Sequence, residues 1–336
     1  MVWQGPTSTR VLIYGGQVIL VAGSANIDFV TRVDHIPAPG ETVLGGNYSV
    51  SGGGKGANQA VACARSGGRV AFLGALGHDS FAAQLKASLQ DSGVQDLSVQ
   101  VDAPTGAAFI SVSAGGENAI TVASGANALL TPQHLPGTEG LSYLVLQLEV
   151  PLATVTAYAT QARAAGVPVV LNAAPAQPLP ESLLQLVDLL VVNEGELSAL
   201  VGAGEVQAQL ERAAGQNTGQ GTGQGPSVVI VTLGSAGSLG LDTRQGHTLV
   251  AIPAIQVEVL DTTGAGDTYV GALVTALSEG QDLPGAMAFA GAAAGLACTR
   301  AGAQPSMPGR SEIDALLAQS DARKQQDVPG PEKMSP

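Results

Sequence analysis

Asp267 follows a glycine turn at the position where a helix is expected to begin. The run Asp261-Thr262-Thr263-Gly264-Ala265-Gly266-Asp267 leads directly into a helical segment that starts at Thr268. Small residues before a helix allow backbone N–H groups to converge on an anion, and the helix N-terminus adds a positive partial charge. A carboxylate in the first helical turn is also a common capping group. The stretch therefore supports two interpretations: an anion hole with an acid/base Asp267, or a capped helix after a tight turn.

A second glycine-rich turn, Ser51-Gly52-Gly53-Gly54-Lys55-Gly56-Ala57-Asn58-Gln59-Ala60, also leads into an expected helix. Its glycines allow close approach of a small polar ligand, with Lys55 and Asn58 as donors on one helical face. The turn is not a Walker loop, because Gly54-Lys55 lacks both the preceding loop length and a following Ser or Thr. The alternative is a plain helix start with a solvated lysine, but it explains the consecutive glycines poorly.

Taken together, these motifs resemble the ribokinase family of sugar kinases, the phosphofructokinase-B-like group. The two family signatures stand at residues 53–58 and 261–267, and shorter matches stand at 23–28, 146–149, 172–176, 193–196, 232–235 and 302–306. The matches keep their order and cover roughly residues 18–315, so they are far more specific than one motif. The resemblance implies transfer of a phosphoryl group from ATP to a small sugar, with the 5-hydroxyl of ribose as the best match.

The resemblance also implies a role for each matching residue in the sugar and phosphoryl sites. Asp267 would take the proton from the attacking hydroxyl, and the backbone N–H groups of the turn before it would bind the transferring phosphoryl group. Catalysis of this kind consists mostly of positioning and charge stabilisation. The turn residues are Gly264, Ala265 and Gly266, and the sugar shell comprises Asn26, Asp28, Gly54, Lys55, Asn58, Glu149 and Asp267 itself.

Nucleotide and cation sites follow from the same resemblance. The nucleotide would contact Asn193, Thr232, Gly234, Ser235, Gly237 and Gly266. Glu196 would hold Mg²⁺ through water, because Mg²⁺ tends to keep its hydration shell. An activating K⁺ would bind oxygens of Asp261, Thr263, Ala297, Arg300, Gly302 and Ser306. Arg300 can contribute only its carbonyl, because a guanidinium cannot ligate a cation. Gly291 stands where many bacterial members carry a histidine near the adenine, which leaves the nucleotide preference open.

Alternating strands and helices are expected to position these motifs. Residues 17–23 form a short apolar run closed by glycine, which is typical of a buried strand. From about residue 141 the pattern alternates, which indicates right-handed crossovers and a parallel sheet covered on both faces. The expected strands are 143–148, 167–171, 189–192 and 228–232, and the expected helices are 152–165, 180–187, 268–277 and 284–298. The predicted fold class is α/β, a ribokinase-like three-layer α/β/α sandwich with a central, mostly parallel sheet.

Residues 28–50 and 105–123 follow a different pattern. β-Branched residues mix with small polar ones, and glycine-rich turns intervene, as in an antiparallel sheet exposed on one face. We interpret this part as a small antiparallel β lid over the sugar. A small sheet is marginal by itself, so we expect its exposed face to pair with a second subunit and form a homodimer.

The remaining segments are expected to carry no chemistry. We predict a single kinase domain over residues 17–315, preceded by a disordered extension at 1–16. Residues 214–227 are low-complexity Gly, Gln and Thr, typical of a flexible surface loop. The polar tail at 316–336 is expected to be partly disordered.

Composition restricts the partners and the compartment. A formal net charge of −13 argues against nucleic-acid and membrane-surface roles, which favour basic faces. No stretch is long and apolar enough to span a bilayer, and no signal-type segment stands at the N-terminus. Cys63 and Cys298 lack metal or disulfide spacing and are expected to be free thiols. A cytoplasmic location follows as the default expectation.

Other functions remain open from the sequence. The small polar shell suits an unmodified pentose, whereas an adenosine kinase would need aromatic surface, and the chain has 5 Phe, 5 Tyr and 1 Trp. Kinases of deoxyribose or fructose are the main rivals. A non-catalytic sugar sensor is disfavoured by the intact Gly-Ala-Gly-Asp motif. A dinucleotide-dependent oxidoreductase is weaker still, since residues 21–26 lack the full glycine fingerprint.

Overall fold

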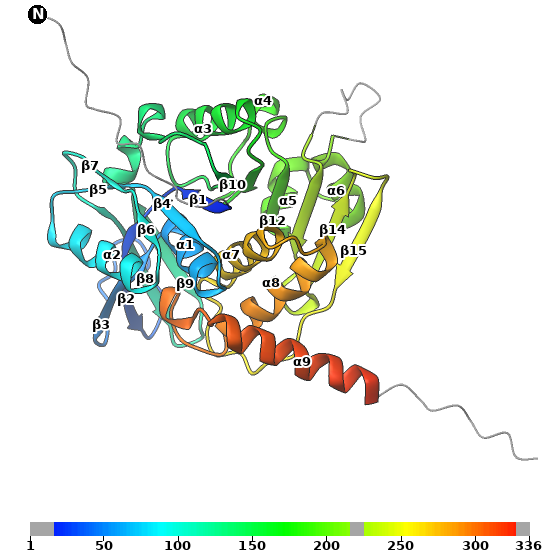
Figure 1. The fold of residues 1–336 in the computed structure, drawn as a ribbon. Helices are drawn as coiled ribbons and strands as arrows, with labels where there is room; N and C mark the ends of the chain where they lie inside the picture. The colour runs from blue at the N-terminus through cyan, green and yellow to red at the C-terminus, as the bar shows by residue number, and fades with distance from the viewer. Residues whose placement is uncertain (1–16, 216–224, 327–336) are drawn as a thin grey trace, which may run out of the picture.

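The computed structural model describes residues 17–215 and 225–326 and is built on one large sheet. Its strands are β1 (Val18–Ala22), β4 (Val70–Leu73), β6 (Gln95–Asp96), β10 (Leu141–Leu146), β11 (Val169–Asn172), β12 (Leu189–Asn193), β13 (Val228–Thr232), β14 (Ser238–Asp242) and β15 (Thr248–Ile252). The nine strands lie in the order β15-β14-β13-β12-β11-β10-β1-β4-β6 (Figure 1). All neighbours from β13 to β6 pair in parallel, and β14 and β15 add antiparallel pairs at one edge.

Helices cover both faces of this sheet. One face packs against α1 (Lys55–Arg65), α2 (Ser80–Asp91), α7 (Ala265–Ser278), α8 (Leu283–Cys298) and α9 (Arg310–Gln326), and the other against α3 (Leu152–Ala164), α4 (Glu181–Leu184), α5 (Glu194–Val201) and α6 (Val206–Ala213). Successive strand residues point to opposite faces, so Ile19 and Val21 join one hydrophobic cluster while Leu20 joins the other. The central strands from β4 to β13 are largely apolar because both faces are buried, whereas β6 and β15 at the edges are partly exposed. The predicted three-layer α/β/α sandwich is confirmed.

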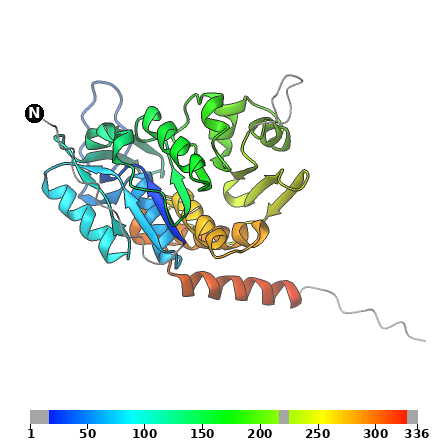
Figure 2. The same cartoon turned by 45° about the horizontal axis from the view of Figure 1, so that its top comes forward.

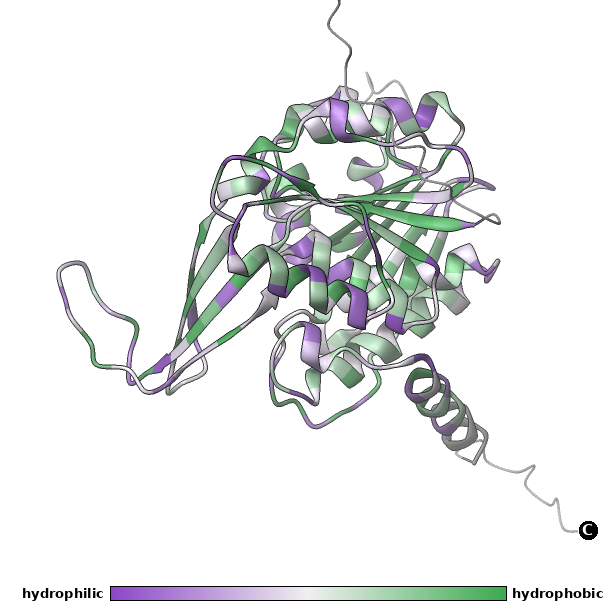
Figure 3. Ribbon diagram, turned by 60° about the vertical axis from the view of Figure 1, so that its left-hand side comes forward, coloured by the Kyte–Doolittle hydropathy of each residue, from purple (hydrophilic) through white to green (hydrophobic). Residues whose placement is uncertain are grey.

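A second sheet stands beside the large one. It contains β2 (Asn26–Val33), β3 (Tyr48–Gly53), β8 (Gly106–Ser113) and β9 (Asn118–Ala123) in the order β3-β2-β8-β9. Figure 3 shows these strands projecting from the body of the fold. The outer pairs are antiparallel, as predicted, but the central pair β2–β8 is parallel. Both central strands start beside the large sheet, where Asn26 pairs with Gly106, and run outward in the same direction.

Shorter elements connect these layers. A parallel pair is formed by β5 (Ala75–Leu76) and β7 (Val99–Gln100), and 3₁₀ turns are η1 (Gly125–Leu129), η2 (Pro132–His134), η3 (Gly234–Ala236) and η4 (Gln304–Ser306). The helix predicted over 180–187 is only the single turn α4. Its next residues continue in turns where Leu186 N–H bonds Leu183 O and Val187 N–H bonds Leu184 O.

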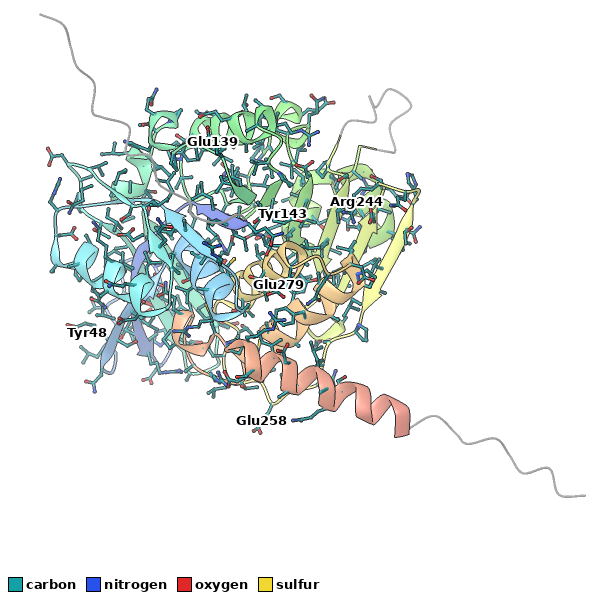
Figure 4. The ribbon with its side chains drawn as sticks, viewed as in Figure 1. Tyr48, Glu139, Tyr143, Arg244, Glu258 and Glu279 are labelled. Carbon is teal, nitrogen blue, oxygen red and sulfur yellow. The ribbon has the colours of Figure 1, made fainter. Side chains whose placement is uncertain are left out.

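Helix α9 continues past residue 315, where we predicted the folded domain to end (Figure 2). Ile313 is fully buried, and Leu316 and Leu317 pack against the same core cluster. Arg310 donates to Glu279 at 2.7 Å, where α7 ends (Figure 4), and its guanidinium lies 4.9 Å from the ring centre of Phe289. These contacts hold α9 against the core, although its polar sequence led us to predict a tail after residue 315.

Three predictions of disorder fall partly or wholly outside the described residues. They concern the N-terminal extension 1–16, most of the loop 214–227 and the end of the C-terminal tail. Within the part of the chain that the structure describes, no helix is long and apolar enough to cross a membrane.

Candidate active site

The turn before α7 has the backbone shape that an anion site requires. Gly264 adopts the left-handed region at φ 75°, and a Cβ at this position would lie 3.0 Å from Ala303. Helix α7 begins at Ala265, earlier than the expected Thr268, and no side chain of the described residues caps it. The capped-helix interpretation is therefore wrong. The helix N-terminus instead presents its partial positive charge to a cavity lined by Gly264, Gly266 and Asp267.

Asp267 turns away from its own helix end and toward α1. Its side chain is buried, at 8% exposure. Asn58 Nδ2 donates to Asp267 Oδ2 at 2.9 Å, and Gln59 Nε2 donates to Oδ1 at 3.0 Å. Two consecutive amides of α1 thus fix the plane of the carboxylate.

The three consecutive glycines before α1 each have a separate steric reason. A Cβ on Gly52 would lie 2.9 Å from Gln304, and one on Gly53 would lie 2.0 Å from the carboxylate of Asp28. Gly54 has φ 86°, and a Cβ there would lie 2.7 Å from the backbone nitrogen of Asn26. The glycines therefore let the β3–α1 turn lie directly against the sugar-shell residues of β2.

Glu149 ties this turn to the large sheet. Its Oε2 accepts from Ser24 Oγ at 2.6 Å and from the backbone N–H of Lys55 at 3.0 Å. Asn26 is also buried, and its Oδ1 accepts from Asn127 Nδ2 at 2.8 Å. All residues predicted for the sugar shell lie at the starts of β2, α1 and α7, except Glu149, which follows β10.

Charges in this shell act strongly on one another. Burial, reinforced by the carboxylates of Glu149 and Asp267, raises the pKa of Asp28 to about 7. Burial works against the charge of Lys55, but Asp267, Glu149 and Glu196 outweigh it and raise its pKa. Burial also raises the pKa of Glu196, although the Asn193 N–H and the Lys55 charge act in the opposite direction. The cation of Lys55 therefore lies close enough to the carboxylates of Asp267, Glu149 and Glu196 to be stabilised by them.

Asp28→Asn is expected to stabilise the ligand-free protein at neutral and higher pH. In wild type, the unfolded state ionises near pH 3.8 while the folded state stays neutral until about pH 7. The carboxyl group therefore costs folding free energy that grows across this window and is constant above it. We expect the variant to gain about 2–4 kcal/mol at pH 8 and almost nothing at pH 3.5, since each pKa unit is worth about 1.4 kcal/mol.

Urea unfolding of both proteins at several pH values measures this difference. Asp79→Asn is a matched control with the opposite sign, because hydrogen bonds from Thr105 and Ala82 outweigh burial and lower the pKa of Asp79. That variant is expected to lose stability at neutral pH and to approach wild type in acid. If the difference in free energy of unfolding between wild type and Asp28→Asn did not change with pH, the raised pKa of Asp28 would be contradicted.

Two adjoining cavities extend from Asp267 toward the sheet edge. The smaller, about 220 Å³, is lined by Lys55, Asn172, Ala174, Val191, Val192, Asn193, Glu196, Thr232, Gly264, Gly266, Asp267 and Val270. The larger, about 370 Å³, contains the predicted nucleotide residues Thr232, Gly234, Ser235, Gly237 and Gly266, with mostly apolar residues of 252–259 opposite. Thr232 and Gly266 line both cavities, so the two meet there.

The residues predicted to hold the nucleotide and Mg²⁺ lie at different points of these cavities. Asn193 and Glu196 form a capping box on α5: Glu196 N–H donates to Asn193 Oδ1 at 2.8 Å, and Asn193 N–H donates to Glu196 Oε2 at 2.9 Å. Glu196 Oε1 is not used by this box. Gly291 lines the larger cavity, and a Cβ there would meet nothing within 4 Å, so this wall has room for a side chain.

The residues predicted to bind K⁺ lie on two neighbouring segments. Asp261 accepts from Thr263 N–H at 2.9 Å, from Thr263 Oγ1 at 2.6 Å and from Gly302 N–H at 2.8 Å. Burial favours the neutral form of Asp261, but these hydrogen bonds outweigh it and lower its pKa. Ala297 and Arg300 stand at the end of α8, and Ser306 Oγ donates to Ala303 O at 2.7 Å. The donor set consists of oxygens, which suits a hard cation.

Several residues in contact with this site were not assigned roles from the sequence. Gln59, Asn172 and Gln304 stood inside recognised motifs, and Asn127 lay outside them. Gln59 contacts Asp267 directly, and Gln304 Nε2 donates to Asn58 Oδ1 at 3.1 Å. The sequence feature that could have pointed to Gln59 is the pair of adjacent amide side chains, Asn58 and Gln59, directly after the glycine turn.

Comparison with known proteins agrees with this picture. The fold sets the N-terminus of α7 and the buried carboxylate of Asp267 beside one cavity, an arrangement that suits a kinase acting on a small alcohol. A family model described as "pfkB family carbohydrate kinase" matches residues 17–310. The chain belongs to this family, and the resemblance drawn from its motifs is confirmed.

Individual relatives are similar over almost the whole chain. A ribokinase of Haemophilus influenzae is 39% identical over 307 residues, which cover 90% of this chain and 98% of the relative. The structure of ribokinase from Thermotoga maritima has a TM-score of 0.81 and 35% identity, covering 90% of this chain and 100% of its own. Arabidopsis thaliana ribokinase complexed with ribose and ATP has a TM-score of 0.79 and 32% identity, with coverages of 90% and 98%.

Proposed function

We propose that the protein transfers the terminal phosphoryl group of ATP to the 5-hydroxyl of ribose, giving ribose 5-phosphate and ADP. The observation that carries this proposal is the place of Asp267, where the polar shell around Asp28 and Glu149 meets the phosphate-sized cavity at the start of α7. The similarity to a ribokinase named as a complex with ribose and ATP supports both substrates. A small, fully polar shell rejects sugars that leave one of its buried groups unpaired.

Each residue then has one step in the reaction. Asp267, held by Asn58 and Gln59, accepts the proton of the attacking hydroxyl. The N–H groups of Gly264 to Gly266 stabilise the negative charge on the transferring phosphoryl group. Lys55 offsets the carboxylates around it and keeps the site from repelling the phosphates. Asn26, Asp28 and Glu149 orient the secondary hydroxyls of the sugar.

Two cations complete the proposed site. A divalent metal accompanies ATP, and Glu196, which lines the smaller cavity and whose Oε1 the capping box does not use, would hold Mg²⁺ through water. The metal would supply charge neutralisation for the phosphates. K⁺ would bind at Asp261, Thr263 and Gly302, with Ala297, Arg300 and Ser306 contributing oxygens from the neighbouring segments.

The substrate assignment is tested by a coupled ADP-release assay across ribose, deoxyribose, fructose and adenosine. We expect the highest kcat/KM with ribose. A loss of one hydroxyl contact in a site that hydrogen-bonds it costs on the order of 10-fold or more, which sets the expected gap to deoxyribose. A higher kcat/KM with fructose, deoxyribose or adenosine would reassign the substrate without changing the kinase class.

We also propose that two copies pair through the small sheet. Ile120 and Val122 of β9 are 55% and 45% exposed. Asp28 pairs with Ala108, which pairs with Val122, so Val122 lies on the face that carries Asp28. A partner covering these residues would also close the sugar side of the site.

Light scattering in dilute solution is expected to give the mass of a dimer. Ile120→Lys should shift the mass toward the monomer, because a charge in an apolar interface is costly. Leu249→Lys, at another exposed aliphatic residue on β15, is the matched control and should leave the dimer intact. A monomeric wild type at micromolar concentration would refute the pairing.

A further inference from the structure

A chain of buried amides extends from Asp267 away from the sugar. Gln59 Nε2 donates both to Asp267 Oδ1 and to Asn172 Oδ1, each at 3.0 Å. Asn172 Nδ2 donates in turn to the backbone carbonyl of Val191 at 3.0 Å, and Gln147 Nε2 donates to Gln59 Oε1 at 2.6 Å. Gln59 is 0% exposed and Gln147 is 1% exposed, so neither side chain can touch a bound sugar or nucleotide.

The direction of these hydrogen bonds is fixed by their ends. An ionised Asp267 and the carbonyl of Val191 can only accept, so Asn172 must turn its NH₂ to Val191 and its Oδ1 to Gln59. Gln59 must then give both of its N–H groups to Asp267 and Asn172. Its Oε1 is left facing Gln147, which must donate. Each amide in the chain therefore has one possible orientation.

Gln147 is held in place at a local cost. Its Oε1 is buried and has no hydrogen-bond partner in the described parts of the chain. It lies against Gly23, where a Cβ would come within 1.9 Å. A buried acceptor without a partner is unfavourable, and such groups persist where another requirement outweighs them. Here the requirement is the hydrogen bond that Nε2 of the same Gln147 amide donates to Gln59 Oε1.

We propose that Gln59 is a positioning residue for Asp267 and that Gln147 acts through it by holding its amide in place. Without the Gln147 donor, Gln59 Oε1 would be a buried acceptor with no partner, and the Gln59 side chain would shift from the position in which it donates to Asp267. The carboxylate would then move from the line of the attacking hydroxyl. The inference rests on the proposed role of Asp267 as the base. Gln59 and Gln147 differ from the residues proposed to bind the sugar, because they affect the reaction without touching either substrate.

The test uses the near-isosteric variants Gln59→Met and Gln147→Met and the double variant. Gln59→Met is expected to lower kcat about 10-fold, in line with a small displacement of a catalytic group, and to leave KM for ribose and ATP nearly unchanged. Gln147→Met should lower kcat by about 3-fold in the same way. The double variant should be no slower than Gln59→Met alone, because a residue that acts only through Gln59 has no effect once Gln59 is gone.

A buried glutamine elsewhere controls for lost stability. Gln209 on α6 is 3% exposed and donates to Ser198 Oγ at 3.0 Å and Gly202 O at 2.8 Å. Gln209→Met should lower the unfolding temperature but leave kcat at the wild-type value. The inference would be overturned if Gln59→Met kept the wild-type kcat, or if it raised KM without lowering kcat. It would also be overturned if the effects of Gln59→Met and Gln147→Met on kcat were additive. If Asp267→Asn itself kept its activity, the base assignment would fail instead, so the two failures are distinguishable.

Discussion

Asp267→Asn is expected to abolish turnover, with kcat lowered more than about 100-fold, because a positioned base contributes at least this much. ATP binding should stay nearly intact, since the nucleotide residues Gly234, Ser235 and Gly237 line the larger cavity, which Asp267 does not line. The change is nearly isosteric, but it removes the proton acceptor. It also opposes the donors already in place: Asn58 and Gln59 each donate to one carboxylate oxygen, and an asparagine would turn its NH₂ toward one of them.

Single-turnover rates and calorimetric titration with an ATP analogue measure the two effects separately. Asp282→Asn provides a matched control, because Asp282 caps α8 by accepting from Gly285 N–H at 2.9 Å and asparagine caps helices equally well. That variant should behave as wild type. An Asp267→Asn enzyme that kept more than about a tenth of the wild-type kcat would sink the base assignment, given the usual contribution of such a group.

The parts of the fold that the sequence predicted well are those set by local patterns. Residues 143–148 and 228–232 are apolar runs between turn signals, and both lie within a residue or two of observed strands β10 and β13. The glycine turns at 52–54 and 264 were recognised because few residue types suit a positive φ or a close backbone approach. Such constraints act on neighbouring residues, so they are visible in one chain.

What the sequence did not reveal depends on contacts between distant segments. The parallel pairing of β2 with β8 joins residues about 80 positions apart through their shared starting edge, which no alternation pattern encodes. Helix α9 is polar by composition, and its packing depends on Ile313 and on the ion pair of Arg310 with Glu279. The amide chain through Gln147, Gln59 and Asn172 brings together three strand and helix ends. Their residue types are ordinary, so only the fold shows that they meet at Asp267.

The site's dependence on K⁺ is the second large effect that we expect. Asp261 joins the turn 261–264 to Gly302, and Gly264 packs against Ala303 on the same neighbouring segment. Its lowered pKa keeps the carboxylate charged at neutral pH, so a cation beside it would be bound by charge as well as by carbonyl oxygens. Holding these two segments together would fix the N–H groups of Gly264 to Gly266 before the phosphate arrives. Loss of one preorganised donor typically costs about 100-fold in kcat, so a partly loosened turn should cost at least about 10-fold.

Steady-state rates in K⁺ and in tetramethylammonium, at equal ionic strength and saturating Mg²⁺, measure this dependence. We expect a rate in K⁺ at least about 10-fold higher, carried by kcat, because the cation would organise transition-state donors and contact neither substrate. Asp261→Asn keeps the acceptor for Thr263 but removes the charge, so it should be slow in both salts. This variant separates a bound cation from a general salt effect. If wild type turned over equally fast in the two salts, the cation assignment would be withdrawn, and Asp267 would remain the base because its hydrogen bonds to Asn58 and Gln59 do not involve Asp261.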